Sequence, residues 1–122
     1  MQIINCTPHP INIQNDNIKK TIQPSGKIIR VDTTPSMKMT TIMGIPVSEP
    51  DLLGEVYLIK DNIKSTLPEE KAGVFYLVSA IVGSQLKGTR TDILIGASAP
   101  KDKPIRHPEK GFILAVRRLK HC

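Results

Sequence analysis

The chain has 122 residues, a length that suits one domain with a single hydrophobic core. Aromatic residues make up only 3% of it and tryptophan is absent, which disfavours a protein that binds single-stranded nucleic acid by repeated base stacking. The formal net charge of +6 favours an anionic partner. Because the lysines and arginines are scattered and form no long basic run, a small phosphorylated molecule fits this charge as well as a nucleic acid does.

The cysteine content and the apolar runs bear on the compartment. Cys6 and Cys122 are the only cysteines and lie at opposite ends of the chain. Free thiols are typical of intracellular proteins, and no signal peptide precedes Ile3. The longest apolar runs, such as residues 113–116, are far too short to span a bilayer. We therefore expect a single cytoplasmic domain over residues 1–122 that has no membrane partner.

The first half of the chain has the pattern of short strands separated by turns. Proline, glycine and asparagine recur at short intervals and interrupt runs of isoleucine and valine. We expect strands at residues 2–6, 11–13, 18–22, 27–31, 44–47 and 56–59. The strands at 11–13 and 18–22 are expected to form a hairpin. Residues 33–41 have weak periodicity and are either a long loop or another hairpin.

The strongest local signals begin after Gly73. Residues 74–78 are continuously apolar and rich in β-formers, as a central strand is. Ser79 is expected to cap a helix over residues 80–87, and Gly88 to end it in a left-handed conformation. A glycine inside this helix, Gly83, indicates the close approach of another backbone.

The remaining third of the chain is expected to be two strands joined by a loop. The strands are predicted at residues 93–95 and 112–119, and the loop at 97–108 contains three prolines. The whole pattern predicts an α+β fold of mostly antiparallel strands that form a twisted sheet or partial barrel, with one main short helix.

The sequence lacks the patterns typical of catalytic and metal sites. Neither cysteine lies in a motif that lowers a thiol pKa, and no serine lies in a G-x-S-x-G elbow. His9 lies between two prolines, where a structural role at a corner is favoured. The pair His121-Cys122 is too sparse for a metal site, and no Walker loop is present. We expect no catalytic residue, no metal and no cofactor, and therefore no enzyme.

Arginine is the residue type best suited to bind a phosphorylated partner, because its planar guanidinium matches two phosphate oxygens at once. An arginine inside a strand of isoleucine and valine, such as Arg30, is harder to explain by solvation than one in a loop. For any single arginine, however, a surface role remains the simpler interpretation, and Arg90 beside Asp92 equally fits a salt bridge. The five arginines are Arg30, Arg90, Arg106, Arg117 and Arg118.

Several motifs, taken in order, resemble a known family of phage and prophage proteins. The motifs are Ile3-Ile4-Asn5-Cys6-Thr7-Pro8-His9-Pro10-Ile11, Pro24-Ser25-Gly26 followed by Arg30-Val31, Gly44-Ile45-Pro46-Val47, Gly73-Val74-Phe75-Tyr76-Leu77-Val78-Ser79 and Arg90-Thr91-Asp92-Ile93-Leu94. They cover nearly the whole chain, and the first and the last are the most specific. On these motifs the chain resembles the first-described type of Thoeris anti-defence protein, a sponge for the cyclic ADP-ribose signal of the host immune system.

The resemblance implies a protein of the host cytoplasm that sequesters a glycocyclic ADP-ribose isomer without cleaving it. It also implies a separate site for cyclic oligonucleotides and a homo-oligomer built from dimers, including hexamers. Arg30 and one of Arg117 and Arg118 would face the phosphates, and residues 86–92 would contact adenine and ribose. The implied ligand-binding residues are Arg30, Leu86, Lys87, Thr89, Arg90, Thr91, Asp92, Arg106, Arg117 and Arg118. The resemblance also implies an aromatic residue near Leu86. This sequence has none there, so no ring is available at that position to stack on the adenine base.

Two other functions remain open at this point. A structural protein that assembles through its strands would use its charge only for solubility. A basic nucleic-acid-binding protein would use the same cations for phosphate contacts, although the scattered charge disfavours it.

Overall fold

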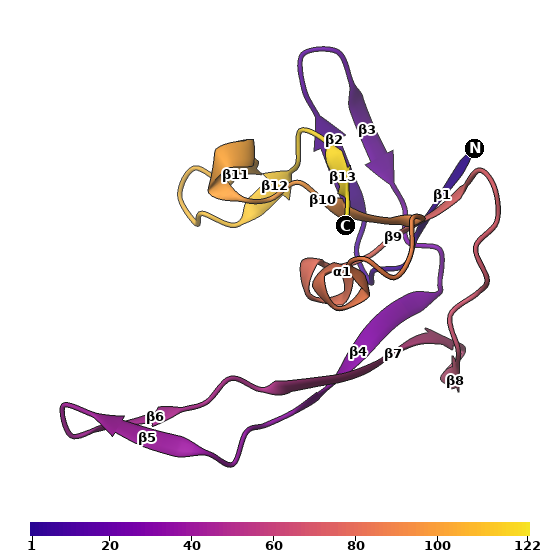
Figure 1. Ribbon diagram of the computed structural model, residues 1–122. Coiled ribbons are helices and arrows are strands. Elements are labelled where there is room, and N and C mark those ends of the chain that lie inside the picture. Colours follow the sequence, from indigo (N-terminus) through magenta and orange to yellow (C-terminus); the bar gives the residue numbers. More distant parts are fainter.

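A four-stranded sheet forms the centre of the computed structural model, which describes residues 1–122 (Figure 1). Its strand order is β1 (Gln2–Asn5), β9 (Val74–Leu77), β10 (Ile93–Gly96) and β13 (Leu119–His121). β9 is parallel to both β1 and β10, whereas β13 is antiparallel to β10. Parallel neighbours need a crossover connection, and α1 (Ala80–Leu86) provides the one between β9 and β10. The continuously apolar segment is thus a central strand, as predicted.

A second sheet lies on the other side of the helix. It consists of β4 (Ile28–Thr34), β7 (Leu52–Lys60) and β8 (Ile63–Ser65), all antiparallel. α1 contacts β10 on one side and β4 and β7 on the other, so it fills the space between the two sheets (Figure 1). The core between these elements consists of Cys6, Ile29, Leu58, Tyr76, Val78, Val82, Leu86 and Ile93. Aliphatic residues dominate this core, and each contributes about 1.5 to 3 kcal/mol by burial.

Three hairpins lie outside these two layers. β2 (Ile11–Gln14) pairs with β3 (Lys19–Ile22), which confirms the predicted hairpin. β5 (Met39–Ile42) pairs with β6 (Ile45–Ser48), so the open question about residues 33–41 is resolved in favour of a hairpin. β11 (Ile105–Arg106) pairs with β12 (Ile113–Ala115), and a short 3-10 helix, η1 (Pro100–Asp102), precedes them.

The predicted fold class is confirmed: most strands are antiparallel, they belong to several sheets, and α1 is the single α-helix. Neither helix has the length and apolar character that crossing a bilayer requires.

The last predicted strand, residues 112–119, is wrong as a continuous element. The structure divides it into β12 and β13, because Val116 leaves the first ladder and joins β2. The Val116 amide donates to the Asn12 carbonyl at 2.9 Å, and the Gln14 amide donates to the Val116 carbonyl at 2.9 Å. Arg117 and Arg118 therefore lie in the connection between two strands, and not within one.

Two expectations about the helix need correction. Ser79 has the extended backbone of an N-cap, but its side chain makes no capping hydrogen bond. Gly83 is closely approached by side chains and not by a backbone, since an added Cβ would lie 2.6 Å from both Cys122 Sγ and Ile95 Cγ2. The left-handed stop at Gly88 is confirmed by its φ of 80°.

Candidate functional site

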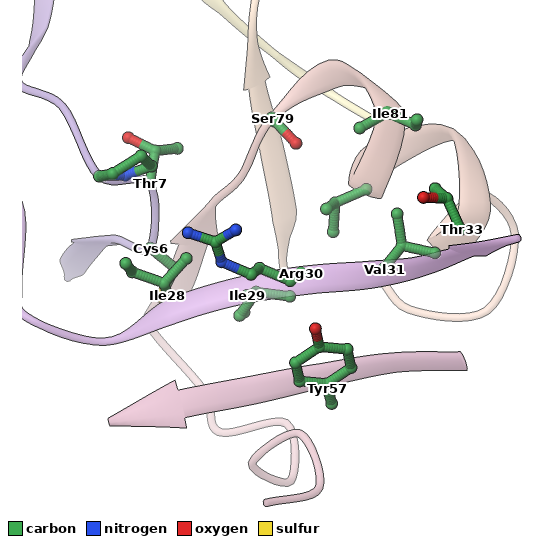
Figure 2. A pocket seen from close by; sticks show the side chains of 12 residues that line it. Cys6, Thr7, Ile28, Ile29, Arg30, Val31, Thr33, Tyr57, Ser79 and Ile81 are labelled. Atoms are coloured by element: carbon green, nitrogen blue, oxygen red, sulfur yellow. The ribbon is translucent and has the colours of Figure 1, made fainter. Parts of the chain in front are cut away.

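Arg30 lies in a pocket of about 300 Å³ where three elements meet (Figure 2). β4 provides Arg30 and β7 provides Tyr57, which is directly opposite it in the strand pairing. Directly paired residues point to the same face of a sheet, so both side chains face the pocket. Thr7, in the corner after β1, and Ser79, at the start of α1, form further parts of the wall.

Arg30 differs from the other arginines because its side chain has no hydrogen-bond partner within the chain. The remaining four guanidinium groups each donate to a carboxylate or to a backbone carbonyl. Arg30 is exposed, and it projects from a strand whose preceding residue, Ile29, is buried in the core. Alternation along β4 therefore anchors the strand on one face and presents an unpaired cation on the other.

The pocket also offers unpaired hydroxyl groups. No hydrogen bond within the chain involves the hydroxyl of Tyr57, and that of Ser79 forms no cap. The Thr7 hydroxyl, in contrast, is occupied: it donates to Asn5 Oδ1 at 2.7 Å and lies 3.0 Å from the His9 carbonyl. Together with Arg30, the two unpaired hydroxyls can donate to an anionic oxygen, and the aliphatic walls can cover an apolar part of the same ligand.

The lining of the pocket includes hydroxyl groups and the Cys6 thiol, but none of the side chains that usually act as a general base. Its lining contains no histidine and no carboxylate. Burial raises the pKa of the Cys6 thiol to about 11, and this effect outweighs the opposing influence of Ser25 and Lys27. Cys6 therefore remains a neutral thiol near pH 7. Elsewhere, no group of three or more histidine, cysteine, aspartate or glutamate side chains is placed to hold a metal ion.

The connection between α1 and β10 was the other predicted binding segment. Arg90 and Asp92 form a bidentate ion pair, with 2.8 Å from Nε to Oδ1 and 2.6 Å from Nη2 to Oδ2. Their side chains are only 14% and 6% exposed. The hydrogen bond with Asp92 raises the pKa of Arg90 above its ordinary value, and the guanidinium carbon lies 5.8 Å from the centre of the Tyr76 ring. This pair fastens the connection to the core.

Most other polar groups of this connection are also satisfied within the chain. The Thr89 hydroxyl donates to the Leu86 carbonyl at 2.7 Å, and the Thr91 amide donates to Glu70 Oε1 at 2.8 Å. Leu86 itself is a core residue with 8% exposure, whereas Lys87 is exposed. Most polar residues of the segment thus form hydrogen bonds within the chain, and these hold the connection between α1 and β10 in place.

The C-terminal arginines bond to the loop between β10 and β12. Arg118 Nη2 lies 2.7 Å from Asp102 Oδ1, and Lys120 Nζ lies 3.3 Å from Asp102 Oδ2. Burial alone would raise the pKa of Asp102, but the hydrogen bond with Lys120 and the charges of both cations lower it. Arg117 Nε donates to the Lys103 carbonyl at 2.8 Å, and Arg106 Nη1 to the Gly111 carbonyl at 2.9 Å.

No second arginine lines the Arg30 pocket. Within one chain, the structure therefore does not bring Arg106, Arg117 or Arg118 to Arg30.

Tyr57 and Ser79 are pocket residues that the sequence patterns do not single out, because they indicate only a strand at Tyr57 and a helix cap at Ser79. Alternation along the strand around Tyr57 is the one signal that could have placed it beside Arg30. A second cavity of about 500 Å³ includes Phe75, Lys20 and His121, and the rings of Phe75 and His121 are 6.1 Å apart. Phe75 lies on the opposite face of β9 from the buried Tyr76 and is half-buried.

Comparison of the chain with family models, with curated proteins and with solved structures gave no match.

Proposed function

We propose that the protein binds a small anionic nucleotide of the cyclic ADP-ribose type and sequesters it without cleaving it. The observation that supports this function is the state of Arg30. It is the one arginine without a partner inside the chain, and it lies in a pocket beside two unpaired hydroxyls. A guanidinium held in this way is a donor for the phosphate of a ligand.

The identity of the ligand comes from the resemblance to the Thoeris anti-defence family. Three of the motifs on which the resemblance is based contribute to the same pocket: the opening motif with Thr7 and Pro8, the Arg30-Val31 pair, and the segment that ends at Ser79. Motifs that are distant in the sequence thus meet around one cation, as a shared ligand would require. The proposed setting is the cytoplasm of a phage-infected host, where the captured molecule is an immune signal.

The energetics favour a ligand enclosed by more than one copy of the chain. Capture at nanomolar concentration needs about −12 kcal/mol, whereas one hydrogen bond to a charged group contributes about 1.5 to 3 kcal/mol. The pocket of about 300 Å³ is at the small end of ligand pockets. A neighbouring copy in a homo-oligomer would cover the ligand and supply the remaining contacts.

Thermal melting with glycocyclic ADP-ribose tests this function. A ligand that binds only the folded state raises the melting temperature, so the wild-type protein and the Lys110→Ala variant should both be stabilised. Lys110 is an exposed cation outside the pocket, and its removal changes the net charge as Arg30→Ala does. The Arg30→Ala protein should show a much smaller shift. Ligand released by heat denaturation should have its original mass.

Three results would contradict the proposal. They are no shift at saturating ligand, an equal shift in the Arg30→Ala protein, and a released ligand that has been cleaved. The first result combined with binding to random DNA that weakens steeply with salt would favour a nucleic-acid-binding protein. The first result alone would favour an assembly protein.

A further inference from the structure

The cavity of about 500 Å³ lies on the face of the central sheet that points away from α1. Each of the four strands contributes one side chain to this side of it. They are Ile3 from β1, Phe75 from β9, Leu94 from β10 and His121 from β13. Tyr76 follows Phe75 along β9 and packs in the core with residues of α1, so alternation turns Phe75 to the opposite face. We call this space the Phe75 cavity.

The β2–β3 hairpin forms a further wall of the Phe75 cavity. The lining residues from this side are Lys20, Thr21, Ile22 and Gln23. Both strands of the hairpin are tied to the body of the molecule. The Asn5 side-chain amide donates to the Ile22 carbonyl at 2.9 Å, and β2 exchanges two hydrogen bonds with Val116. The wall is therefore held in place without a ligand, as is usual in sites for small molecules.

The charged and polar groups of the cavity favour an anionic ligand. No carboxylate lines it, and Lys20 is its one lysine or arginine. The ammonium group of Lys20 belongs to none of the four ion pairs of the chain and donates no hydrogen bond within it. The side chains of Gln23 and His121 likewise have no hydrogen-bond partner in the chain. An anionic group that enters the cavity therefore meets a free cation and no like charge.

The apolar groups of the cavity favour a ligand that carries a planar ring. Five of the nine lining residues are hydrophobic. The half-buried ring of Phe75 lies edge-on to the imidazole of His121, with 6.1 Å between the ring centres and 62° between the planes. Aromatic rings prefer edge-on and offset contacts, so the ring of a ligand can pack on the exposed part of Phe75.

The single lysine favours a carboxylate over a phosphate ester. A carboxylate carries one negative charge, which one ammonium group balances. A phosphate monoester carries about −1.5 to −2 near pH 7, and its excess charge would leave water for apolar walls without a partner. The cavity also has no arginine that could bind two phosphate oxygens at once.

We propose that the Phe75 cavity binds a small aromatic carboxylate. The ring of the ligand packs on Phe75, and its carboxylate accepts a hydrogen bond from the Lys20 ammonium group. This site is separate from that of the proposed function, because the Phe75 cavity and the Arg30 pocket share no lining residue. Failure of either one is therefore a result distinct from failure of the other.

An NMR titration with 2-naphthylacetate tests the site. The backbone amide signals of Lys20, Phe75 and Leu94 should shift as the probe is added, and that of Arg30 should not. The dissociation constant should be about 1 mM or lower, as expected for a ligand of this size. The alcohol 2-(2-naphthyl)ethanol has the same rings without the charge. It should bind at least about 10-fold more weakly, the equivalent of one charged hydrogen bond.

Two lysines of β3 provide a matched pair of variants. Lys20→Ala should weaken binding of 2-naphthylacetate by about 10-fold or more. Lys19→Ala changes the net charge equally, but Lys19 lies outside the lining, so this variant should bind the probe as the wild-type protein does. Both side chains are exposed, so both variants should fold. Arg30→Ala should also bind the probe normally, which separates this site from the Arg30 pocket.

The assignment is wrong if the signals show no saturable shift up to about 5 mM probe, or if they shift around another part of the molecule. Equal weakening by Lys20→Ala and Lys19→Ala overturns it as well, since the charge would then act only at long range. Tighter binding of adenosine monophosphate at the same amides would assign the cavity to a phosphorylated ligand. Tighter binding of decanoate there would assign it to an aliphatic acid, and either result overturns the aromatic carboxylate.

Discussion

The Arg30 pocket and the connection between α1 and β10 both place cations beside hydroxyl groups, yet the two regions use them differently. In the connection, Arg90 is occupied by Asp92, and the Thr89 hydroxyl is occupied by a backbone carbonyl. In the pocket, no group of the chain pairs with Arg30. For this reason we base the proposed site on Arg30, the one arginine whose guanidinium has no hydrogen-bond partner in the chain.

The largest effect is expected from breaking the buried pair of the connection. Asp92→Ala would leave the Arg90 guanidinium, 14% exposed, without its partner, and should lower the free energy of unfolding by about 3 kcal/mol. Urea denaturation measures this loss. The control Lys64→Ala removes an ion pair whose side chains are 58% and 50% exposed, and it should cost less than about 1 kcal/mol. Equal effects of the two substitutions would show that the connection is not locked by its ion pair.

In the pocket, we expect a substitution to weaken ligand binding without lowering the stability of the fold. Arg30→Ala should weaken ligand binding by about 10- to 150-fold, the equivalent of one charged hydrogen bond of about 1.5 to 3 kcal/mol. Because the side chain has no partner in the chain, the free energy of unfolding without ligand should stay within about 0.5 kcal/mol of the wild-type value. Calorimetric titration and urea denaturation on the same preparation measure both quantities. A destabilised Arg30→Ala protein would mean that Arg30 has a structural role like that of Arg90.

The Cys6 thiol, which is part of the pocket lining, should have a smaller, pH-dependent effect on the free energy of unfolding. The pKa of Cys6 is about 11 in the folded protein and 9.0 in its ordinary state, so above pH 9 the unfolded chain loses its proton first. The free energy of unfolding should therefore fall as the pH rises from about 9 to about 11, by about 2 kcal/mol from this group. Comparing denaturation of the wild-type protein and Cys6→Ala across this range isolates the contribution. The same slope in both proteins would contradict the assigned burial.

The smallest loss of stability is expected from removing the contact between Glu70 and the connection. Glu70→Ala removes the acceptor of the Thr91 amide, and that contact is exposed to solvent. Water can replace the carboxylate there, so the loss of stability should be only about 0.5 to 1 kcal/mol. Denaturation compared with that of Asp92→Ala ranks the two contacts. A larger loss of stability from Glu70→Ala than from Asp92→Ala would show that the Glu70 contact, and not the Arg90–Asp92 ion pair, holds the connection in place.

The elements that the sequence predicts well are those fixed by local patterns. The β2–β3 hairpin follows from its turn residues, and β9 and α1 follow from an apolar run and a glycine stop. Contacts between distant segments are not encoded in such patterns. The parallel pairing of β1 with β9 joins residues about seventy positions apart, and the break at Val116 arises because β2 competes for its backbone.

The candidate site likewise combines one residue that a local pattern indicates with others that only contacts between distant segments bring together. Arg30 is visible in the sequence because a cation among aliphatic residues of a strand is unusual. Its neighbours come from other elements: the pairing of β4 with β7 places Tyr57 beside it, and the packing of α1 between the two sheets brings Ser79 to the same pocket. The sequence left a salt bridge between Arg90 and Asp92 open, and the structure confirms it. The pairing of Arg118 with Asp102, which lie 16 positions apart, follows from no local pattern.

A crystal structure of the protein with glycocyclic ADP-ribose tests the central claim most directly. We predict an intact ligand in the pocket between β4, β7 and α1, with a phosphate oxygen about 2.7 to 2.9 Å from the Arg30 guanidinium. A ligand bound elsewhere, with Arg30 still facing solvent, would contradict it.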